Sequence, residues 1–403
     1  MQVDYKALAK EYKTPYYIYD FDQIKINYQA IKSAFKARKS LVCYAIKANS
    51  NLSVIKTLAQ EGSGADCVSI GEVKRALYAG IDKYKIIFSG VGKSDEEIKE
   101  ALELDILMIN IESEAELSRV EIVAQELNKK ARISVRVNPN IDPKTHPYIS
   151  TGLHENKFGV DIDTAKRIYI KAKNSEFLDP VGIHFHIGSQ LTQLQPIKES
   201  AIIVANLVRN LQALDIEIKF FDIGGGIGIK YDNETLIDLN EYAQNILETL
   251  FGLDVTIVCE PGRYIVGNCG EFVTKVLYEK TNGGKRFVIV DGAMNDLIRP
   301  SLYNAYHKIE VLGKMDEEMS DCNVVGPVCE SGDFFAKNID LPKTTNDDLV
   351  VIYSAGAYGF TMSSNYNTRN KVAELSLEDG SVRMIRKRDS FEDQIANERE
   401  FLL

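Results

Sequence analysis

The chain alternates between short apolar runs and amphipathic stretches from residue 41 to residue 260. Eight apolar runs predict strands, at 41–46, 65–68, 85–88, 106–109, 131–137, 181–187, 218–223 and 255–259. Five stretches between them repeat their apolar residues every 3.6 positions and predict helices, at 95–104, 114–127, 164–172, 196–214 and 236–251. Continuously apolar strands that alternate with helices are typical of a parallel sheet covered on its outer side. We therefore predict an α/β chain built on a (β/α)8 barrel of the TIM type.

A different pattern follows residue 260, where the helical periodicity fades. Segments rich in β-formers and separated by Gly and Asn predict strands, at 271–279, 286–291, 323–327, 349–354 and 371–377. The run at 16–19 predicts a further strand of this C-terminal all-β domain. We expect a barrel domain over 22–268 and a β-sandwich or β-barrel-like domain over 1–21 and 269–403. The charged segment 383–403 predicts a surface helix.

Composition narrows the class of protein. With 45% hydrophobic and 26% charged residues, the 403-residue chain has the composition of a soluble globular protein. Its net charge of −10, without a basic run, argues against a nucleic-acid partner. No stretch is apolar enough for a membrane span, and the start lacks the apolar core of a secretory signal, so we expect a cytoplasmic protein. The six cysteines show no ligand spacing, so we expect neither disulfides nor a metal.

Polar residues stand at or near the end of each predicted barrel strand. The C-terminal ends of barrel strands converge on one mouth, where such folds keep their active sites. Any single polar residue there could instead cap the helix that follows, but a set with a lysine, an arginine, a histidine and a carboxylate indicates chemistry. The set comprises Lys47, Asp66, Ser89, Asn110, Arg136, His186, Gly224 to Gly226 and Glu260.

Lys47 is the most informative member of this set. A lysine where a buried strand opens into a site can be desolvated, which frees its amine to form a Schiff base with an aldehyde. A surface lysine that merely ends a strand is the simpler interpretation of Lys47 taken alone. The turns that follow other predicted strands, at 186–189, 224–226 and 260–263, favour the chemical interpretation.

Three of these turns together predict a phosphate site. The triplet Gly224 to Gly226 lets backbone N–H groups approach an anion without interference from a Cβ, although a Gly triplet alone could be only a tight turn. Arg263 and Ser189 add donors on neighbouring strands, in the region where barrels often bind phosphate. A lysine that faces a phosphate site inside a barrel indicates pyridoxal 5'-phosphate as the cofactor.

Glu260 is the candidate partner of the cofactor's pyridine nitrogen. A carboxylate there keeps the nitrogen protonated, so that the ring accepts electrons, whereas an arginine would suit a racemase. Glu260 therefore favours decarboxylation over racemisation. We expect His186 to stack on the ring face, and His184, one pleat deeper, to face the core.

These motifs resemble those of the barrel-type, pyridoxal-phosphate-dependent amino acid decarboxylases, which have the alanine-racemase-like fold. The likeness covers nearly the whole chain and rests on the motifs at 44–49, 64–69, 184–189, 224–226, 260–263, 329–333 and 356–359. Within that family, the stretches 294–303 and 145–152, the latter followed by 157–159, most resemble the diaminopimelate decarboxylases.

The resemblance implies roles for individual residues. Lys47 would carry the cofactor, and Cys329 would donate a proton from the partner subunit of a homodimer with shared active sites. Implied cofactor contacts are Lys47, Asp66, His186, Ser189, Gly225, Gly226, Glu260, Gly262, Arg263 and Tyr358. Implied substrate contacts are Arg263, Arg299, Tyr303, Glu330 and Tyr358.

The reaction implied is the conversion of meso-2,6-diaminopimelate to L-lysine and CO2, the last step of lysine biosynthesis. Arg299 with Tyr303 suits the distal carboxylate of that substrate, and Glu330 suits its distal ammonium. The same fold could instead decarboxylate ornithine, arginine or carboxynorspermidine. A non-catalytic binding protein of this fold would be free to lose Lys47 or Cys329, and both are present.

Overall fold

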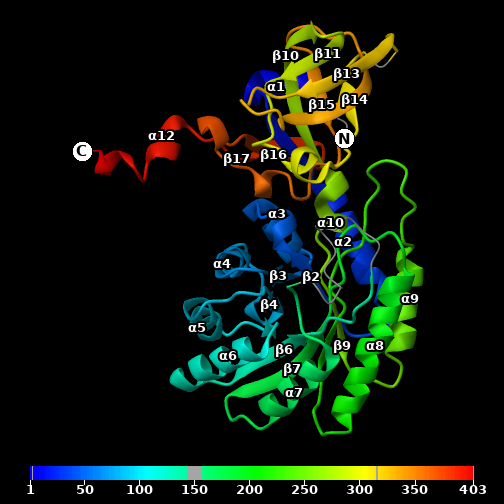
Figure 1. The fold of residues 1–403 in the computed structure, drawn as a ribbon, viewed down its shortest axis with the longest axis vertical. Coiled ribbons are helices and arrows are strands. Elements are labelled where there is room, and N and C mark those ends of the chain that lie inside the picture. The colour runs from blue at the N-terminus through cyan, green and yellow to red at the C-terminus, as the bar shows by residue number, and fades with distance from the viewer. Residues whose placement is uncertain (2, 143–156, 315, 403) are drawn as a thin grey trace. The chain divides into compact units, whose positions relative to one another are not determined.

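The computed structural model describes residues 1, 3–142, 157–314 and 316–402 (Figure 1). The chain divides into two compact units. The barrel unit comprises Lys25–Ile229 and Thr235–Ile265, and the β unit comprises Met1–Ile24, Lys230–Glu234 and Val266–Leu403. The stretch 145–152, which resembles the diaminopimelate decarboxylases, lies outside the described residues.

Eight parallel strands close into a barrel in the barrel unit, as the sequence predicts. Neighbours in the chain pair in order, and the last strand pairs with the first, Leu41 lying opposite Val258. The strands are β2 (Ser40–Ala45), β3 (Gly64–Cys67), β4 (Ile86–Phe88), β5 (Met108–Ile111), β6 (Ala131–Arg136), β7 (Leu178–His184), β8 (Phe220–Asp222) and β9 (Thr256–Cys259).

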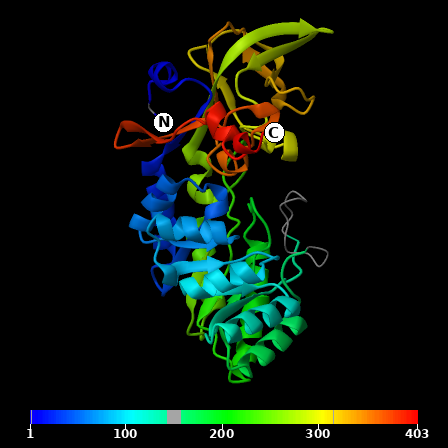
Figure 2. The same cartoon turned by 90° about the vertical axis from the view of Figure 1, so that its left-hand side faces the viewer.

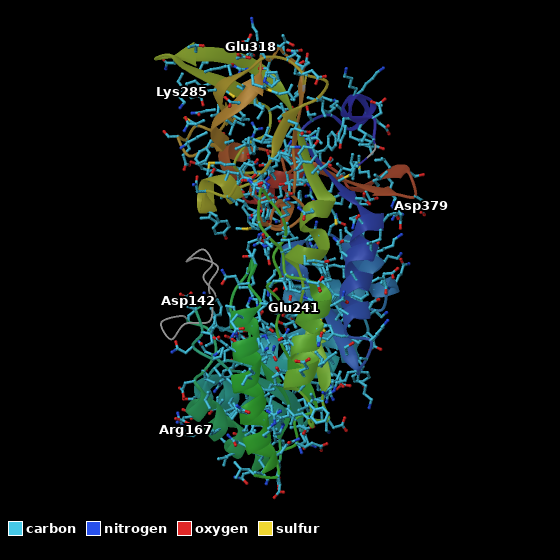
Figure 3. The ribbon with its side chains drawn as sticks, turned by 90° about the vertical axis from the view of Figure 1, so that its right-hand side faces the viewer. Asp142, Arg167, Glu241, Lys285, Glu318 and Asp379 are labelled. Carbon is cyan, nitrogen blue, oxygen red and sulfur yellow. The ribbon has the colours of Figure 1, made fainter. Side chains whose placement is uncertain are left out.

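Helices follow the barrel strands and surround them (Figure 1). Side-chain caps fix where several begin: Ser94 and Glu97 form a reciprocal capping box on α5, and Asp161 accepts two backbone N–H bonds at the start of α7. Arg167 of α7 and Glu241 of α9 belong to their exposed polar faces (Figure 3). The helices are α2 (Phe21–Ala34), α3 (Leu52–Gln60), α4 (Ile70–Tyr78), α5 (Asp95–Leu104), α6 (Glu114–Glu126), α7 (Ile162–Lys173), α8 (Gln195–Gln212), α9 (Leu239–Thr249) and α10 (Arg263–Val266).

The β unit is a nine-stranded sheet that includes the N-terminal strand, as predicted. β1 lies between β10, with which it is antiparallel, and β16, with which it is parallel. The strands are β1 (Tyr16–Asp20), β10 (Gly270–Asn282), β11 (Lys285–Val290), β12 (Ile309–Val311), β13 (Met319–Val325), β14 (Phe334–Pro342), β15 (Leu349–Ile352), β16 (Ala373–Glu378) and β17 (Ser381–Arg386). Short helices accompany the sheet: α1 (Tyr5–Tyr12), α11 (Arg299–Tyr303) and α12 (Phe391–Ile395).

The predicted C-terminal surface helix is mostly wrong. Residues 381–386 form β17, which pairs antiparallel with β16, and only the five residues of α12 are α-helical beyond it among those described (Figure 2). Asp379 and Gly380 turn the chain with φ values of 48° and 73°, the left-handed pair that a tight hairpin requires. The charged outer strand of the hairpin has the composition of a surface helix, because exposed strands and exposed helices are both rich in polar residues.

Within the described ranges, no helix combines the length and the apolar character needed to cross a bilayer.

Candidate active site

Lys47 lies in the single turn of 3-10 helix, Ile46–Ala48, that directly follows β2. Its Nζ is 2.8 Å from Oδ2 of Asp66, and the Lys47 side chain is 38% exposed whereas that of Asp66 is 1% exposed. Burial and repulsion from Glu260 raise the pKa of Asp66, and Lys47 opposes them. The amine is therefore held in place by a buried carboxyl group and remains accessible from the barrel mouth.

A cavity of about 490 Å³ opens beside this amine. Six of the strand-end residues selected from the sequence meet in its lining: Lys47, Asp66, Ser89, Arg136, His186 and Glu260. Asn110 is instead fully buried, and its Nδ2 donates to the Ser89 hydroxyl at 2.9 Å. The prediction that these strand ends share one mouth is confirmed for the residues that line the cavity.

Glu260 directly follows β9 and is 6% exposed. Its Oε2 is 3.1 Å from Nε2 of His184, the last residue of β7. Burial raises the pKa of Glu260, but His184 and Lys47 outweigh burial and lower it below the usual range. Oε1 of Glu260 is buried without a hydrogen-bond partner among the described residues. Glu260 is thus an ionised carboxylate with a buried oxygen available to a donor.

His184 is buried, as the core-facing interpretation expects, but it also lines the cavity and contacts Glu260. The sequence interpretation missed this contact because strand alternation gives the face of a residue and not its partner on another strand.

The glycine triplet forms a backbone turn that no other residue could form. Gly224 and Gly226 have φ values of 65° and 104°, in the left-handed region that disfavours side chains. A Cβ on Gly225 would lie 2.1 Å from the carbonyl oxygen of Glu260, and one on Gly226 would lie 2.2 Å from that of Gly188. The triplet therefore packs backbone directly on backbone beside Glu260 and the His186 to Ser189 turn.

His186 has one ring nitrogen fixed by this turn. Its Nδ1 accepts a hydrogen bond from the Gly225 N–H at 3.3 Å, which leaves Nε2 to carry the proton. Burial among protein atoms, with repulsion from Arg136 and Lys47, holds the pKa of His186 well below its usual value. His186 is therefore a neutral ring whose orientation is set by the backbone.

Arg136 is held at the cavity by a carboxylate that the sequence interpretation did not select. Glu112 is 3% exposed, and its Oε1 lies 3.4 Å from Nη1 of Arg136. The same carboxylate accepts backbone N–H bonds from Gly90 at 3.2 Å and from Gly159 at 3.0 Å. Glu112 therefore joins two loops of the barrel mouth to the Arg136 side chain.

Arg263 and Ser189 meet as the predicted anion site requires. Nε and Nη2 of Arg263 lie 3.3 and 3.1 Å from the Ser189 hydroxyl oxygen. Arg263 is 6% exposed. A Cβ on Gly262 would lie 3.0 Å from the Cβ of Ala48, so this turn packs closely against the segment that carries Lys47.

Arg299 and Tyr303 lie in the β unit, at the two ends of α11. Their i, i+4 spacing puts both side chains on one helix face. Nη1 of Arg299 is 2.8 Å from Nε2 of His307, and its guanidinium lies 4.7 Å from the centre of the Tyr231 ring. Nδ1 of His307 donates to the Tyr353 carbonyl at 2.8 Å. His307 can accept from Arg299 only while it is neutral, so it fixes a buried guanidinium without neutralising its charge.

Cys329 lies in an exposed loop of the β unit, whereas the other five cysteines are buried. Asp333 shapes this loop: its two carboxylate oxygens accept the backbone N–H groups of Met294 and Val328, both at 2.7 Å. Glu330 is exposed beside Cys329. The loop presents the thiol and a carboxylate to solvent on a frame anchored by a buried aspartate.

Tyr358 is half-buried in the β unit and has a left-handed backbone with a φ of 57°. Such a conformation costs a non-glycine residue roughly 1–3 kcal/mol. The glycines on either side fix it, since a Cβ on Gly356 would lie 1.9 Å from the Val266 carbonyl oxygen and one on Gly359 2.5 Å from that of Ala355.

Comparison with known proteins places the chain in a family. The family model described as "Pyridoxal-dependent decarboxylase, pyridoxal binding domain" matches residues 21–267. The diaminopimelate decarboxylase of Campylobacter jejuni is 66% identical over 401 residues, which is 99% of this chain and 100% of that protein. The chain belongs to the diaminopimelate decarboxylase family. The predicted resemblance is confirmed, and as a family member the chain is a pyridoxal-dependent decarboxylase.

Solved structures of diaminopimelate decarboxylases agree with the fold. The crystal structure of the Helicobacter pylori diaminopimelate decarboxylase complexed with L-lysine matches with a TM-score of 0.96 at 57% identity, covering 99% of this chain and 100% of that one. The Vibrio vulnificus lysine/ornithine decarboxylase complexed with cadaverine matches with a TM-score of 0.82 at 24% identity, and covers 93% of this chain and 95% of that one. The second likeness shows a shared fold only.

Proposed function

We propose that the chain uses bound pyridoxal 5'-phosphate to convert meso-2,6-diaminopimelate to L-lysine and CO2, the last step of lysine biosynthesis. The observation that carries the proposal is the meeting of Lys47 and Glu260 in one cavity of a chain that is 66% identical to a diaminopimelate decarboxylase. The lysine bound to the Helicobacter relative is the product that this reaction would form.

The residues of the barrel mouth fit a pyridoxal phosphate. The amine of Lys47 faces the cavity, and Glu260 offers a buried carboxylate oxygen without a hydrogen-bond partner among the described residues. The backbone of Gly224 to Gly226 leaves no room for side chains, which suits close approach by an anion. When bound, the cofactor supplies an aldehyde for amines and a ring that accepts the electrons of the broken carbon–carboxylate bond.

We assign the following work to the barrel residues. Lys47 would hold the cofactor covalently through its amine. Glu260, ionised beside His184, would keep a proton on the ring nitrogen, and neutral His186 would pack on the ring. Asp66 holds the Lys47 amine at 2.8 Å. The remaining proposed contacts with the cofactor, chiefly with its phosphate, are Gly225, Gly226, Gly262, Arg263, Ser189 and Tyr358.

We assign recognition of the substrate to the arginine and tyrosine side chains. Arg299, with Tyr303 on the same helix face, binds the distal carboxylate, because a guanidinium fixed by His307 can offer two parallel N–H donors. Glu330 binds the distal ammonium. Arg263 and Tyr358 contact both cofactor and substrate. A substrate with no distal carboxylate forgoes the two bonds that this guanidinium can offer, so such substrates are disfavoured.

We also propose a homodimer with shared active sites, acting in the cytoplasm. Cys329 donates the proton that replaces the departing carboxylate, and it serves the site of the partner subunit. Its exposure on an anchored loop supports this role, since the other five thiols are buried. All six cysteines are free, as a reducing compartment requires.

One assay tests the proposed reaction. The protein is supplied with pyridoxal 5'-phosphate and, separately, with meso-diaminopimelate, ornithine, arginine and carboxynorspermidine, and CO2 and the amine product are measured. We expect CO2 and L-lysine in equal amounts from diaminopimelate and at least tenfold lower kcat/KM for the others, a difference of about 1.4 kcal/mol in transition-state binding. Equal or faster release of CO2 from ornithine would overturn the assignment of substrate.

A further inference from the structure

Three buried titratable side chains cluster at the ends of three barrel strands, and two of them line the cavity. His184 ends β7, Asp222 ends β8, and Glu260 follows β9, so three adjacent strands supply one side chain each. They are 2%, 0% and 6% exposed, and one nitrogen or oxygen atom of each lies within 4.8 Å of the others. Glu260 and His184 line the cavity and already have roles, whereas Asp222 has none.

The hydrogen bonds of the two carboxyl groups are incomplete unless one of them carries a proton. Asp222 accepts from the Gly224 N–H through Oδ1 at 2.9 Å, and Glu260 contacts His184 through Oε2. Oδ2 of Asp222 and Oε1 of Glu260 are both buried without a partner among the described residues. Two neighbouring buried carboxylates cannot both stay ionised, because each desolvated charge repels the other. A single shared proton removes the repulsion and satisfies two buried oxygens.

The surroundings decide which carboxyl group holds the proton. His184 and Lys47 lower the pKa of Glu260 and so favour its ionised form. Burial raises the pKa of Asp222 well above its usual range, and repulsion from Glu260 and Asp66 adds to the rise. Cys43, Cys259 and Tyr242 also sense Asp222, and none of them supplies positive charge.

We propose that Asp222 is a buried carboxylic acid that keeps its proton, donates a hydrogen bond to Glu260 and, together with His184, positions the ionised Glu260 carboxylate for the ring nitrogen of the cofactor. Asp222 is a positioning residue, since it acts through Glu260. Each carboxylate oxygen accepts up to two hydrogen bonds, so Glu260 can accept from Asp222, from His184 and from a ring N–H together. The contact between Glu260 and the ring nitrogen rests on the proposed function, whereas the protonation of Asp222 does not.

Infrared spectroscopy of the full chain tests the protonation state. In protein labelled with carboxyl-13C aspartate, we expect a carboxylic-acid C=O band at pH 8 that shifts with the label and is absent from Asp222→Asn. Asp296 is the matched control: it is buried in the β unit, and burial raises its pKa to about 7, so it is mostly ionised at pH 8. Asp296→Asn should leave the pH 8 band unchanged. Absence of a label-sensitive acid band at pH 8, or its persistence in Asp222→Asn, would overturn the proposal.

A pair of variants tests the positioning role. In Asp222→Asn the amide can accept from Gly224 and donate to Glu260, as the acid does, whereas Asp222→Leu has a similar size and can do neither. We expect Asp222→Leu to weaken binding of pyridoxal 5'-phosphate at least tenfold and Asp222→Asn to recover most of that loss. Equal weakening in both variants would refute positioning by a neutral donor. The infrared result needs neither bound cofactor nor Asp222→Leu, so it decides the protonation state even if that variant does not fold or the wild type does not bind the cofactor.

Discussion

The reactivity assigned to Lys47 follows from its neighbours and not from its type. The amine is fixed at 2.8 Å from Asp66 and faces a cavity that also contains Glu260. Lys74, by contrast, is 56% exposed on α4 and pairs with Glu100 at the surface, where an ion pair contributes little to stability. Two lysines of one chain thus offer a direct comparison.

Lys47→Ala should abolish both decarboxylation and the visible absorbance of lysine-linked pyridoxal phosphate, because among the described residues the Lys47 amine alone is held in the cavity by Asp66. Lys74→Ala is the matched control and should keep both. The measurements are the absorption spectrum with and without borohydride, and CO2 release. Unchanged absorbance in Lys47→Ala would show that the cofactor is attached elsewhere.

Arg299→Lys should raise the KM for diaminopimelate at least tenfold, equivalent to about 1.4 kcal/mol, with a smaller change in kcat. The lysine keeps the charge but loses the planar group that contacts His307 and Tyr231 and can grip a carboxylate with two bonds. Arg383→Ala, at a 60% exposed arginine of the same unit, is the control and should leave KM unchanged. A KM within threefold of wild type in Arg299→Lys would argue against its contact with the distal carboxylate.

At the residue scale, the sequence identifies polar side chains at strand ends. It does not identify the side chains that hold them in position through hydrogen bonds. Lys47, Asp66, His186 and Glu260 could be selected because polar residues interrupt apolar runs at predictable places. Asp222 also interrupts an apolar run, two residues before the glycine triplet, and that signal was available. Glu112 directly follows β5, but its contacts with Gly90, Arg136 and Gly159 could not be predicted because they join distant parts of the chain.

At the element scale, the glycine turn after β8 is the part of the site least tolerant of change. Gly225→Ala should weaken binding of pyridoxal 5'-phosphate at least tenfold, because the new Cβ would lie 2.1 Å from the Glu260 carbonyl oxygen and must displace backbone. Gly71→Ala is the control: its Cβ would meet only Ser69 Oγ at 3.6 Å, and alanine stabilises a helix by about 0.5–1 kcal/mol relative to glycine. Titration with the cofactor and thermal unfolding measure both effects. Normal cofactor affinity in Gly225→Ala would show that the turn can move without loss.

A second element-scale prediction concerns acid stability of the sheet in the β unit. Arg286 binds Glu279 across the β10–β11 hairpin at 2.6 Å and donates to the Leu341 and Pro342 carbonyls at the end of β14. Partial burial raises the pKa of Glu279, but bonds from Arg286 and Thr344 outweigh it and lower the pKa to about 2.

Because the folded pKa of Glu279 lies below the unfolded value of about 4.3, its stabilisation is present above that value and is lost as the pH falls towards 2. Glu279→Gln should therefore lower the free energy of unfolding at pH 7 by on the order of 2 kcal/mol, and the difference from wild type should shrink below pH 4. Exposed Glu318 provides the control variant Glu318→Gln (Figure 3). A difference that does not change between pH 7 and pH 3 would contradict the linkage.

Elements with strong periodicity could be predicted, and elements defined by pairing could not. The helix expected at 95–104 coincides with α5, and all eight barrel strands lie where apolar runs stand. β12, β14 and β17 were missed because they are short or polar and exist through their partners: β14 pairs with β13, and most of its residues are not buried. Pairing between distant segments is a long-range property that local patterns do not contain.

At the scale of the whole molecule, the chain ends are part of the fold of the β unit. β1, at residues 16–20, bridges β10 and β16, which stand more than 250 residues later in the sequence. Tyr16, Ile18, Val273, Val351 and Leu375 form one buried cluster across these strands. The sequence predicted that this strand belongs to the β unit, because the run at 16–19 precedes the regular strand–helix repeat of the barrel and has no place in it.

The proposed sharing of active sites between subunits belongs to this largest scale. Lys47→Ala removes the cofactor attachment but leaves Cys329, and Cys329→Ala has the opposite defect. If Cys329 serves the partner's site, a mixed dimer contains one site with both residues and one with neither. Random exchange makes half of the dimers mixed in a two-fold symmetric enzyme, so activity should return to about a quarter of the wild-type value.

The experiment mixes the two inactive variants, with different affinity tags so that hybrids can be quantified, and follows CO2 release during exchange. Cys322→Ala in place of Cys329→Ala is the control, since Cys322 is buried and should remain active alone. Each variant alone sets the baseline. Hybrids without recovered activity would place Cys329 in the site of its own subunit or outside the reaction, because a thiol serving its own site cannot be supplied by the partner. If the site is shared, CO2 release should rise in proportion to the fraction of hybrid dimers.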